Sequence, residues 1–233
     1  MTNPTVIPAN ATTFDDSSSQ TTRDATAPAD AANNTIYIWC VLDGNGGSIA
    51  STGFTAVHDN IPIYTGSVTA RASLLRKVEG SSPPSVYTIT SASERMVGVC
   101  WAVSDDNGVD GTAVDDGAAA ASANCPTVTP SEVACSVFLL VGTDNVSLSH
   151  GTVSGFTPIA SVEHASGGTV SVQYKQLSTT DATGDQSVSL GVNEEWVGVT
   201  LVVQGDGVVA GGDAGRLITA VPLKSKIGGA LTS

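Results

Sequence analysis

Short apolar runs, spaced about ten residues apart, dominate the chain from Thr35 onward. The runs are rich in Val, Ile, Thr and aromatic residues, and clusters of Gly, Asn, Asp, Ser or Pro separate them. No longer segment keeps the apolar period of an amphipathic helix, which is about 3.6 residues. The pattern is therefore typical of an antiparallel β-sandwich or barrel. The predicted strands cover residues 36–42, 54–58, 67–77, 86–91, 96–104, 135–142, 156–162, 169–177, 186–190 and 196–204.

Two phrases of this pattern resemble each other closely: ERMVGVCWAV at 94–103 and EEWVGVTLVV at 194–203. Other apolar runs recur in the same order and at a similar distance. The further matches are IYIWCV at 36–41 with SVFLLV at 136–141, GFTA at 53–56 with GFTP at 155–158, and SVTARASLLRK at 67–77 with TVSVQYKQL at 169–177. Because the offset stays at about 100 residues and changes only in loops, the sequence predicts a duplicated unit of about five strands.

Strict alternation within the repeated phrase identifies its buried face. The predicted core positions are Val97, Val99, Trp101 and Val103 with their counterparts Val197, Val199, Leu201 and Val203. On the opposite face, Gly98 and Gly198 leave room for another segment to cross close to the strand. A single sheet with one apolar face is not stable alone, so we expect the two units to bury these faces against each other in one sandwich. Two independent small barrels are the alternative.

Segments of different composition flank and divide this sandwich, which we expect to span residues 35–206. The boundaries follow the change from polar sequence to apolar runs and back again. The expected segments are an extended polar N-terminal arm at 1–34, repeat halves at 35–112 and 135–206, a connector at 113–134, and a C-terminal docking tail at 207–233.

The arm and the tail are the expected points of attachment to other subunits. The arm is too polar to form a core, so it would be ordered only by lying on another surface, such as a neighbouring subunit. The tail combines apolar and basic residues in an otherwise acidic protein, so it would dock on the domain or on an acidic partner; a frayed terminus is the alternative. The predicted partner-anchoring residues are Val6, Ile7, Phe14, Leu217, Ile218, Leu223, Lys224 and Lys226.

The charge of the chain argues against nucleic acid as a partner. The formal net charge is −13, the pI is near 4.2, and charged residues make up only 13% of the chain. Phosphate binding needs clustered Lys and Arg instead. The sequence begins without the basic start and apolar run of a secretory signal, and no apolar run approaches the length that spans a bilayer. We therefore expect a soluble protein without membrane insertion.

Metal and disulfide chemistry has limited support in the sequence. The four cysteines lack CxxC spacing, which argues against zinc, although Cys125 and Cys135 flank a short Pro-containing loop and could pair in an oxidising setting. The stretch SDDNGVDGTAVDDG at 104–117 offers oxygen ligands of the kind that calcium takes. The candidate calcium ligands are Asp105, Asp106 and Asp110. The stretch departs from the spacing of an EF-hand loop, so a solvated turn is the favoured interpretation and no cofactor is expected.

Catalytic motifs are not found in the sequence. The histidines are His58, His150 and His164, and none lies near a GxSxG-like turn. The sequence contains no P-loop, dinucleotide-binding or HExxH motif. We therefore predict that the protein is not an enzyme.

Three aromatic residues outside the predicted core row could form a binding surface. Tyr37 and Trp39 share one face of the first strand, and Trp196 lies opposite the core row. They could stack on a host glycan, line a subunit interface, or be covered by the arm or the tail. Burial is the favoured interpretation.

Several of these motifs together resemble the jelly-roll-type structural domains of virion proteins in tailed bacteriophages. The shared features are a first apolar strand with a Trp, the GFT step, strand endings such as LLRK and VQYK, and the later stretch WAVSDDNGVDGTAV. The resemblance covers residues 35–206 and carries over no catalytic residues. It implies an accessory virion component, such as a capsid decoration or cement protein, a head fibre or spike, or a tail or baseplate protein.

Together these features predict an all-β, jelly-roll-like antiparallel β-sandwich of about ten strands, built from two ~100-residue repeats. The expected function is that of a non-enzymatic virion protein, namely a capsid decoration, cement or head-surface protein. Its termini would anchor it to major capsid or tail proteins. We expect a homo-oligomer, with a trimer as the first state to test, that joins the virion in the host cytoplasm. The alternative is a host-surface glycan-binding module of a tail, baseplate or head spike.

Overall fold

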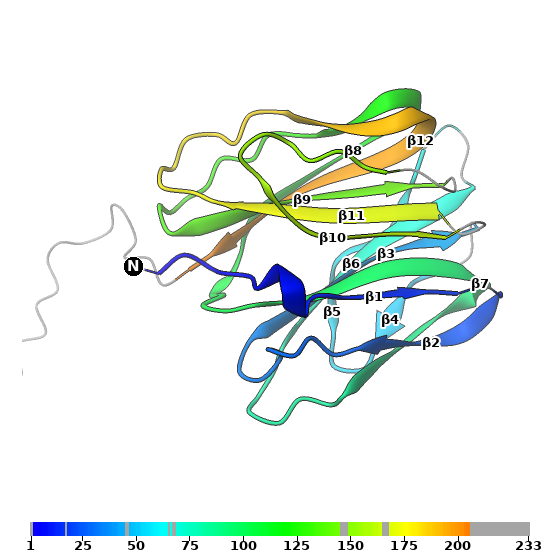
Figure 1. Cartoon of the computed structure of the whole chain (residues 1–233), viewed down its shortest axis with the longest axis horizontal. Coiled ribbons are helices and arrows are strands. Elements are labelled where there is room, and N and C mark those ends of the chain that lie inside the picture. The colour runs from blue at the N-terminus through cyan, green and yellow to red at the C-terminus, as the bar shows by residue number, and fades with distance from the viewer. Residues whose placement is uncertain are drawn as a thin grey trace, which may run out of the picture.

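β-Strands make up nearly all of the regular structure in the computed structural model (Figure 1). The structure describes residues 2–16, 18–44, 47–64, 66, 69–144, 149–164 and 168–205. The elements are η1 (Pro8–Asn10), a 3₁₀ turn, and the strands β1 (Thr12–Asp15), β2 (Gln20–Thr26), β3 (Thr35–Asp43), β4 (Ala50–Ser51), β5 (Thr55–Pro62), β6 (Ala70–Val78), β7 (Val86–Val103), β8 (Gly108–Cys125), β9 (Cys135–Thr143), β10 (Thr157–His164), β11 (Gly168–Gln176) and β12 (Gln186–Gln204). None of the described segments forms a helix that could cross a bilayer.

The strands form two antiparallel sheets, which confirms the prediction of an all-β fold. The first has seven strands in the order β1-β7-β3-β6-β5, with β2 and β4 also paired to β7. The second has five strands in the order β10-β11-β9-β12-β8. The chain completes the first sheet before it enters the second. The jelly-roll path is therefore not observed, because a jelly roll is built from Greek keys in which the chain passes between the two sheets.

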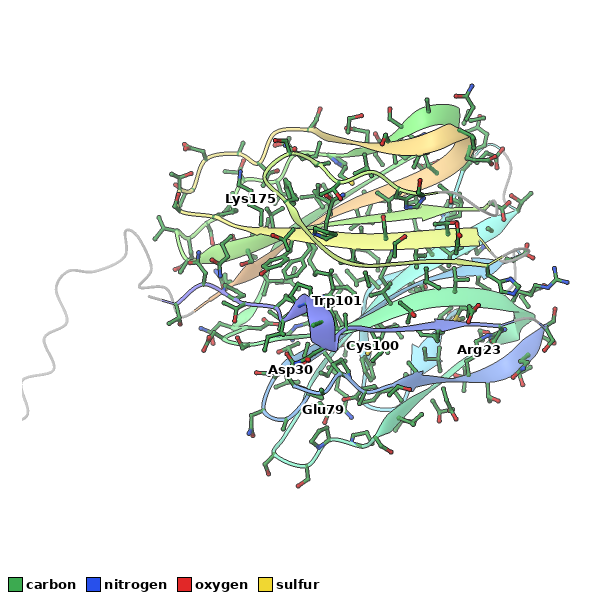
Figure 2. All side chains as sticks on the ribbon, viewed as in Figure 1. Arg23, Asp30, Glu79, Cys100, Trp101 and Lys175 are labelled. Atoms are coloured by element: carbon green, nitrogen blue, oxygen red, sulfur yellow. The ribbon has the colours of Figure 1, made fainter. Side chains whose placement is uncertain are left out.

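The two sheets pack face to face around one apolar core. This core contains all eight positions that alternation predicts, Val97, Val99, Trp101, Val103, Val197, Val199, Leu201 and Val203. Aromatic rings fill its centre: Tyr37 stacks on Trp101 at 5.5 Å and Phe138 stacks on Tyr174 at 5.9 Å between ring centroids. Figure 2 shows Trp101 between the sheets. These rings bury large apolar areas against each other and so contribute strongly to packing between the sheets.

Both sheets are also covered on their outer faces. β7 turns back on itself near residues 91–95, so its first half pairs with β2 and β4 while its second half pairs with β1 and β3 (Figure 1). Ile89 of the first half joins Ile38 of β3 in a second apolar cluster. On the other sheet, Val188 of β12 and Cys125 of β8 join Leu139 of β9 in a third cluster.

This double burial explains the composition of the two central strands. Eight of nine residues in β3 and all nine in β9 are buried. A strand that is covered on both faces gains from apolar residues at every position, whereas a half-exposed strand alternates. The uninterrupted runs IYIWCVL and CSVFLLV are therefore the sequence signature of two central strands in a covered sandwich.

The predicted room for a crossing segment is confirmed at Gly198, while at Gly98 a side chain of the paired strand fills it. A Cβ atom on Gly98 would lie 2.1 Å from the Phe14 ring, and a Cβ on Gly198 would lie 2.1 Å from the carbonyl oxygen of Asn124. Gly198 therefore lets the outer part of β8 pass close to the sheet, whereas Gly98 accommodates the ring of Phe14, its ladder partner on the adjacent strand β1.

The alignment of the first apolar run at an offset of one hundred is wrong by one residue. In the structure, Trp39 pairs with Val99, and Leu140 pairs with Val199. Trp39 and Leu140 both face the inter-sheet core, whereas Leu139 faces the third cluster. A continuous apolar run carries no alternation that could fix the register, and a one-residue slip exchanges the two faces.

Four strands lie where the sequence predicts none. β1 and β2 belong to the polar arm and pair with β7, so the arm is ordered on its own chain rather than on a neighbouring subunit. β4 is a short strand that also pairs with β7. β8 occupies the acidic stretch and residues 113–125 of the predicted connector. The predicted docking tail at 207–233 lies outside the described residues.

Candidate functional site

The two ends of the described chain meet at one end of the sandwich. Thr5 forms a β-bridge with Ser104, and a Cβ on Gly205 would lie 2.0 Å from the carbonyl oxygen of Thr2. Figure 1 shows the N-terminus and the end of β12 on this side. We call this end the terminal pole. The opposite end, where β7 and β12 bend and where β3 and β9 finish, is the loop pole.

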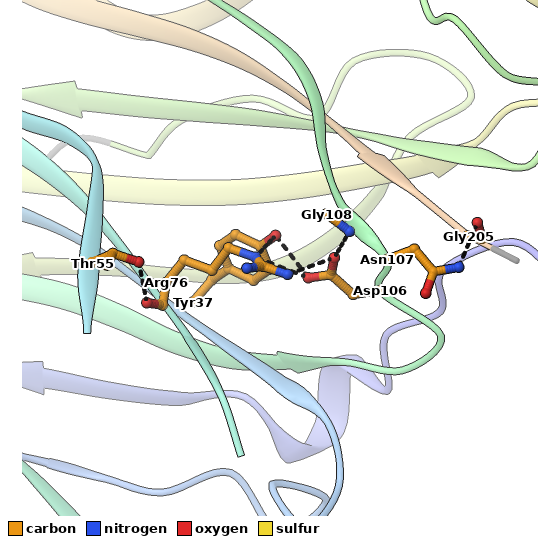
Figure 3. Close-up of polar contacts among 7 residues, drawn as sticks. All are labelled: Tyr37, Thr55, Arg76, Asp106, Asn107, Gly108 and Gly205. Carbon is orange, nitrogen blue, oxygen red and sulfur yellow. Dashed lines mark hydrogen bonds and ion pairs between the residues drawn. The ribbon is translucent and has the colours of Figure 1, made fainter. Parts of the chain in front are cut away.

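A buried polar network lies between the sheets at the terminal pole (Figure 3). The Tyr37 hydroxyl donates to Asp106 Oδ2 at 2.8 Å, and Arg76 Nε donates to the Tyr37 oxygen at 3.1 Å. Arg76 Nη2 and Asp106 Oδ1 form an ion pair at 3.1 Å, and the Gly108 amide donates to Asp106 Oδ1 at 2.7 Å. The Asp106 side chain is 0% exposed and that of Arg76 is 21% exposed. The network joins β3, β6 and the connection from β7 to β8.

The electrostatics of this network hold Tyr37 and Arg76 each in one protonation state. Burial raises the pKa of the Tyr37 hydroxyl well above its ordinary value, and the charge of Asp106 raises it further. Burial alone would lower the pKa of Arg76, but its hydrogen bond to Asp106 and the adjacent charges raise it instead. Tyr37 therefore remains a neutral donor and Arg76 a cation, as in a structural ion pair rather than an acid–base pair.

The three candidate calcium ligands do not converge. Asp106 belongs to the network above. Asp110 accepts hydrogen bonds from the Ser131 amide at 2.6 Å and from the Gln204 amide group at 3.2 Å. Asp105 is exposed and accepts from the Ser104 hydroxyl at 3.4 Å. Among the described residues, no group of three or more His, Cys, Asp or Glu side chains is placed to hold a metal ion.

The three candidate surface aromatics are buried. Tyr37 and Trp39 are 0% exposed and lie between the sheets, where the Trp39 indole donates to the Val141 carbonyl at 3.1 Å. Trp196 is 7% exposed and packs over Gly117, whose Cβ would lie 2.5 Å from the indole ring. None of the three presents a ring face to a ligand in this structure.

The candidate anchors of the arm have different environments. Val6 is buried in the inter-sheet core and Phe14 packs on Gly98, so both hold the arm to its own chain. Ile7 is 53% exposed. The candidate anchors of the tail, Leu217, Ile218, Leu223, Lys224 and Lys226, lie outside the described residues.

Two histidines lie against hydroxyl groups, and the described cysteines are free thiols. His150 Nδ1 lies 2.8 Å from the Ser171 hydroxyl, and burial lowers its pKa to about 4, so the ring is neutral near pH 7. His58 Nε2 lies 2.7 Å from the Thr112 hydroxyl. Cys125 and Cys135 are both free thiols, and burial raises their pKa values, that of Cys135 to about 11. Such thiols are poor nucleophiles.

The GFT motif forms one local structure twice. Gly53 and Gly155 adopt φ values of +80° and +82°, which glycine reaches without steric cost. The turn that contains Gly53 places Phe54 beneath Lys77, whose Nζ is 5.7 Å from the ring centroid. The second turn likewise places Phe156 beneath Lys175 at 5.9 Å.

The first of these units carries further groups that the sequence interpretation missed. Lys77 Nζ also lies 5.4 Å from the Tyr87 ring centroid and 2.6 Å from Glu79 Oε1. The signal available in the sequence was the spacing from GFT to LLRKVE, but nothing in it indicated that β7 would fold back and bring Tyr87 to the same place.

Comparison with known proteins gives no match: no protein-family model, no curated protein and no solved structure matches this chain.

Proposed function

We propose that this chain is a non-enzymatic structural protein of a tailed-bacteriophage virion, namely a capsid decoration, cement or head-surface protein. The observation that carries the proposal is the terminal pole, where both ends of the described chain leave one side of the sandwich. A subunit attached through its ends at one pole directs the opposite pole away from the surface that holds it. Attachment through chain ends spreads many small contacts over neighbouring subunits, which suits a lattice.

The surface and charge of the chain support a role in assembly. Three of its nine basic residues, Arg216, Lys224 and Lys226, follow the terminal pole in sequence, while the net charge is −13. A basic, apolar segment suits contact with acidic surfaces, whether these belong to neighbouring capsid proteins or to further copies of this acidic chain. Partners in this proposal are major capsid or tail proteins, and the oligomer is a homo-oligomer, with a trimer as the first state to test.

We also propose that the sandwich arose by internal duplication. The order β5-β6-β3-β7 in one sheet corresponds to β10-β11-β9-β12 in the other. Strand register supports the correspondence. Trp39 occupies the same place in the first sheet as Leu140 does in the second, 101 residues later in the sequence. Lys77 corresponds in the same way to Lys175, 98 residues later. The two GFT turns agree with this correspondence.

Removal of residues 206–233 tests the anchoring role. We expect purified particles to contain the full chain and to lose it when these residues are deleted, because the deletion removes the segment that continues from the terminal pole. The measurements are a cryo-EM map of the particle and quantitative mass spectrometry of its proteins. Val192→Ser is the matched control, since Val192 is 48% exposed on β12 at the loop pole and should not affect attachment. Retention of the truncated chain, or absence of the full chain from particles, would contradict the proposal.

Recognition of a host glycan is the second candidate function. The buried rings of Tyr37 and Trp39 do not support it, but a separate surface cavity beside Lys77 does. In this alternative, the chain would contact the host from a tail, a baseplate or a head spike.

A further inference from the structure

A surface cavity of about 260 Å³ lies on the outer side of the first sheet, where β4, the end of β6 and the start of β7 meet. Its lining residues are Ser51, Thr52, Lys77, Pro84, Val86, Tyr87 and Thr88. The volume is slightly below the range of about 300–1,000 Å³ that is usual for drug-sized ligands. The cavity therefore suits a ligand of about one sugar ring.

Lys77 is held in one place at this cavity. Its ammonium group forms an ion pair with Glu79 at 2.6 Å and lies over the rings of Phe54 and Tyr87. These two rings pack edge to face at 5.2 Å, and a Cβ on Gly53 would lie 3.1 Å from Lys77 Cε. A lysine fixed in this way loses little side-chain entropy when it binds a ligand.

The lining of the cavity has a polar part and an apolar part. Ser51 donates its hydroxyl proton to the Thr88 carbonyl at 2.9 Å, and Thr88 donates its own to Asp24 at 2.9 Å. Their hydroxyl oxygens keep lone pairs that can accept hydrogen bonds. Pro84 and Val86 form the apolar part, and Val86 is 38% exposed. A ligand with hydroxyl groups on one side and C–H groups on the other matches this division.

The charge around the cavity favours an uncharged ligand. The positive charge of Lys77 is balanced by Glu79, and the whole chain carries −13. An anionic ligand would therefore gain little from Lys77 and would be repelled at long range. The Lys77 ammonium group can instead donate to a hydroxyl of a neutral sugar, and the hydroxyl oxygens of Ser51 and Thr88 can accept from others.

We propose that this cavity binds a neutral sugar residue, with the C–H face of the ring against Pro84 and Val86 and its hydroxyls toward Lys77, Ser51 and Thr88. The site is separate from the attachment of the chain to a virion. The sugar-binding proposal applies whether the chain is a decoration protein or a tail component. If the cavity binds no sugar, the anchoring proposal is unaffected.

The second half of the chain offers a matched control. Lys175 lies over Phe156 as Lys77 lies over Phe54, but it lines neither this cavity nor the smaller one beside His150. Figure 2 shows Lys175 and Glu79 on different sheets, far from each other. Lys175→Met removes an equivalent cation from an equivalent turn without changing the cavity.

Saturation-transfer NMR on the full chain tests the proposal. The probes are free glucose, galactose, mannose and N-acetylglucosamine, with N-acetylneuraminic acid as the anionic comparison. We expect transfer to at least one neutral sugar, about tenfold weaker binding in Lys77→Met, and unchanged binding in Lys175→Met. Val86→Arg is a second variant, because it blocks the mouth of the cavity from an exposed position that tolerates substitution.

Circular dichroism and thermal unfolding confirm that each variant is folded before binding is compared. The proposal is overturned if no neutral sugar receives saturation, or if only N-acetylneuraminic acid does. It is also overturned if Val86→Arg binds as the unmodified chain does, or if Lys77→Met and Lys175→Met weaken binding equally.

Discussion

At the scale of single residues, the acidic stretch after β7 acts as a structural clamp rather than as a metal loop. Adjacent aspartates have different roles: Asp105 is exposed, while the Asp106 side chain is fully buried and bound to Arg76 and Tyr37. A buried charge without its partner is costly, so the three groups stabilise the fold only together. The clamp fixes the point where the chain leaves the first sheet for the second.

Asp106→Asn should lower the free energy of unfolding by about 2 kcal/mol, because the charge-assisted hydrogen bonds to Arg76 are lost. Urea denaturation followed by tryptophan fluorescence measures the change. Asp105→Asn is the matched control: it removes the same charge from the acidic chain at the preceding, exposed position, and we expect a change within about 0.5 kcal/mol. Equal effects of the two substitutions would show that the buried contacts of Asp106 add nothing to the free energy of unfolding beyond the effect of net charge.

At the scale of elements, the sequence predicts strands well where side chains determine them and poorly where the backbone does. The predicted strands appear near their expected ranges, since apolar runs and alternation mark them, but 86–91 and 96–104 are one strand, β7, and 186–190 and 196–204 are one strand, β12. β8 is rich in Gly, Ala and Asp, and its pairing with β12 rests on main-chain hydrogen bonds along the edge of the sheet. β1 and β2 are polar and pair with β7 in the same way. Composition alone assigns such segments to loops.

In the candidate site, too, some features could be predicted from local sequence patterns and others could not. Alternation identified the eight core positions, and the absence of side chains at Gly98 and Gly198 indicated close contacts, because both signals are local in sequence. The partners of Lys77 could not be predicted. Tyr87 reaches it only because β7 folds back over the outer face of the sheet, and no local pattern specifies that bend.

Alanine substitutions at Gly198 and Gly98 should lower the free energy of unfolding by amounts that depend on the atoms that the new methyl group would meet. Gly198→Ala would meet the backbone carbonyl of Asn124, which cannot rotate away, whereas Gly98→Ala would meet the Phe14 ring, which can shift. We expect a loss of roughly 3 kcal/mol for Gly198→Ala and roughly 1–2 kcal/mol for Gly98→Ala. Gly80→Ala is the control, because no atom lies within 4 Å of its Cβ position. Chemical denaturation of the three variants measures the order.

The contact between Gly98 and Phe14 can be tested separately. In a Phe14→Ala background the ring is absent, so the added cost of Gly98→Ala should fall toward that of the control. A cost that is unchanged in this background would mean that the Phe14 ring does not lie over Gly98.

At the scale of the whole molecule, the two sheets depend on each other. The central core draws on both, with Trp101 and Val99 from one and Phe138 and Leu201 from the other. The outer clusters, in contrast, each belong to one sheet and its own folded-back strands. Each half of the chain can therefore cover its outer face without help, but it leaves a large apolar inner face exposed when it is alone.

Separation of the halves should therefore abolish cooperative folding. Fragments 1–107 and 108–233 divide the chain between the sheets, and we expect neither to give dispersed amide signals in NMR or a sigmoidal urea transition, because each exposes its half of the central core. An equimolar mixture should recover the dispersed spectrum, since the buried interface supplies the binding energy that the covalent link otherwise makes intramolecular. Two independent small barrels would behave differently, with each fragment folding alone and mixing changing neither spectrum. The comparison therefore decides whether the two sheets fold only together, as one cooperative sandwich.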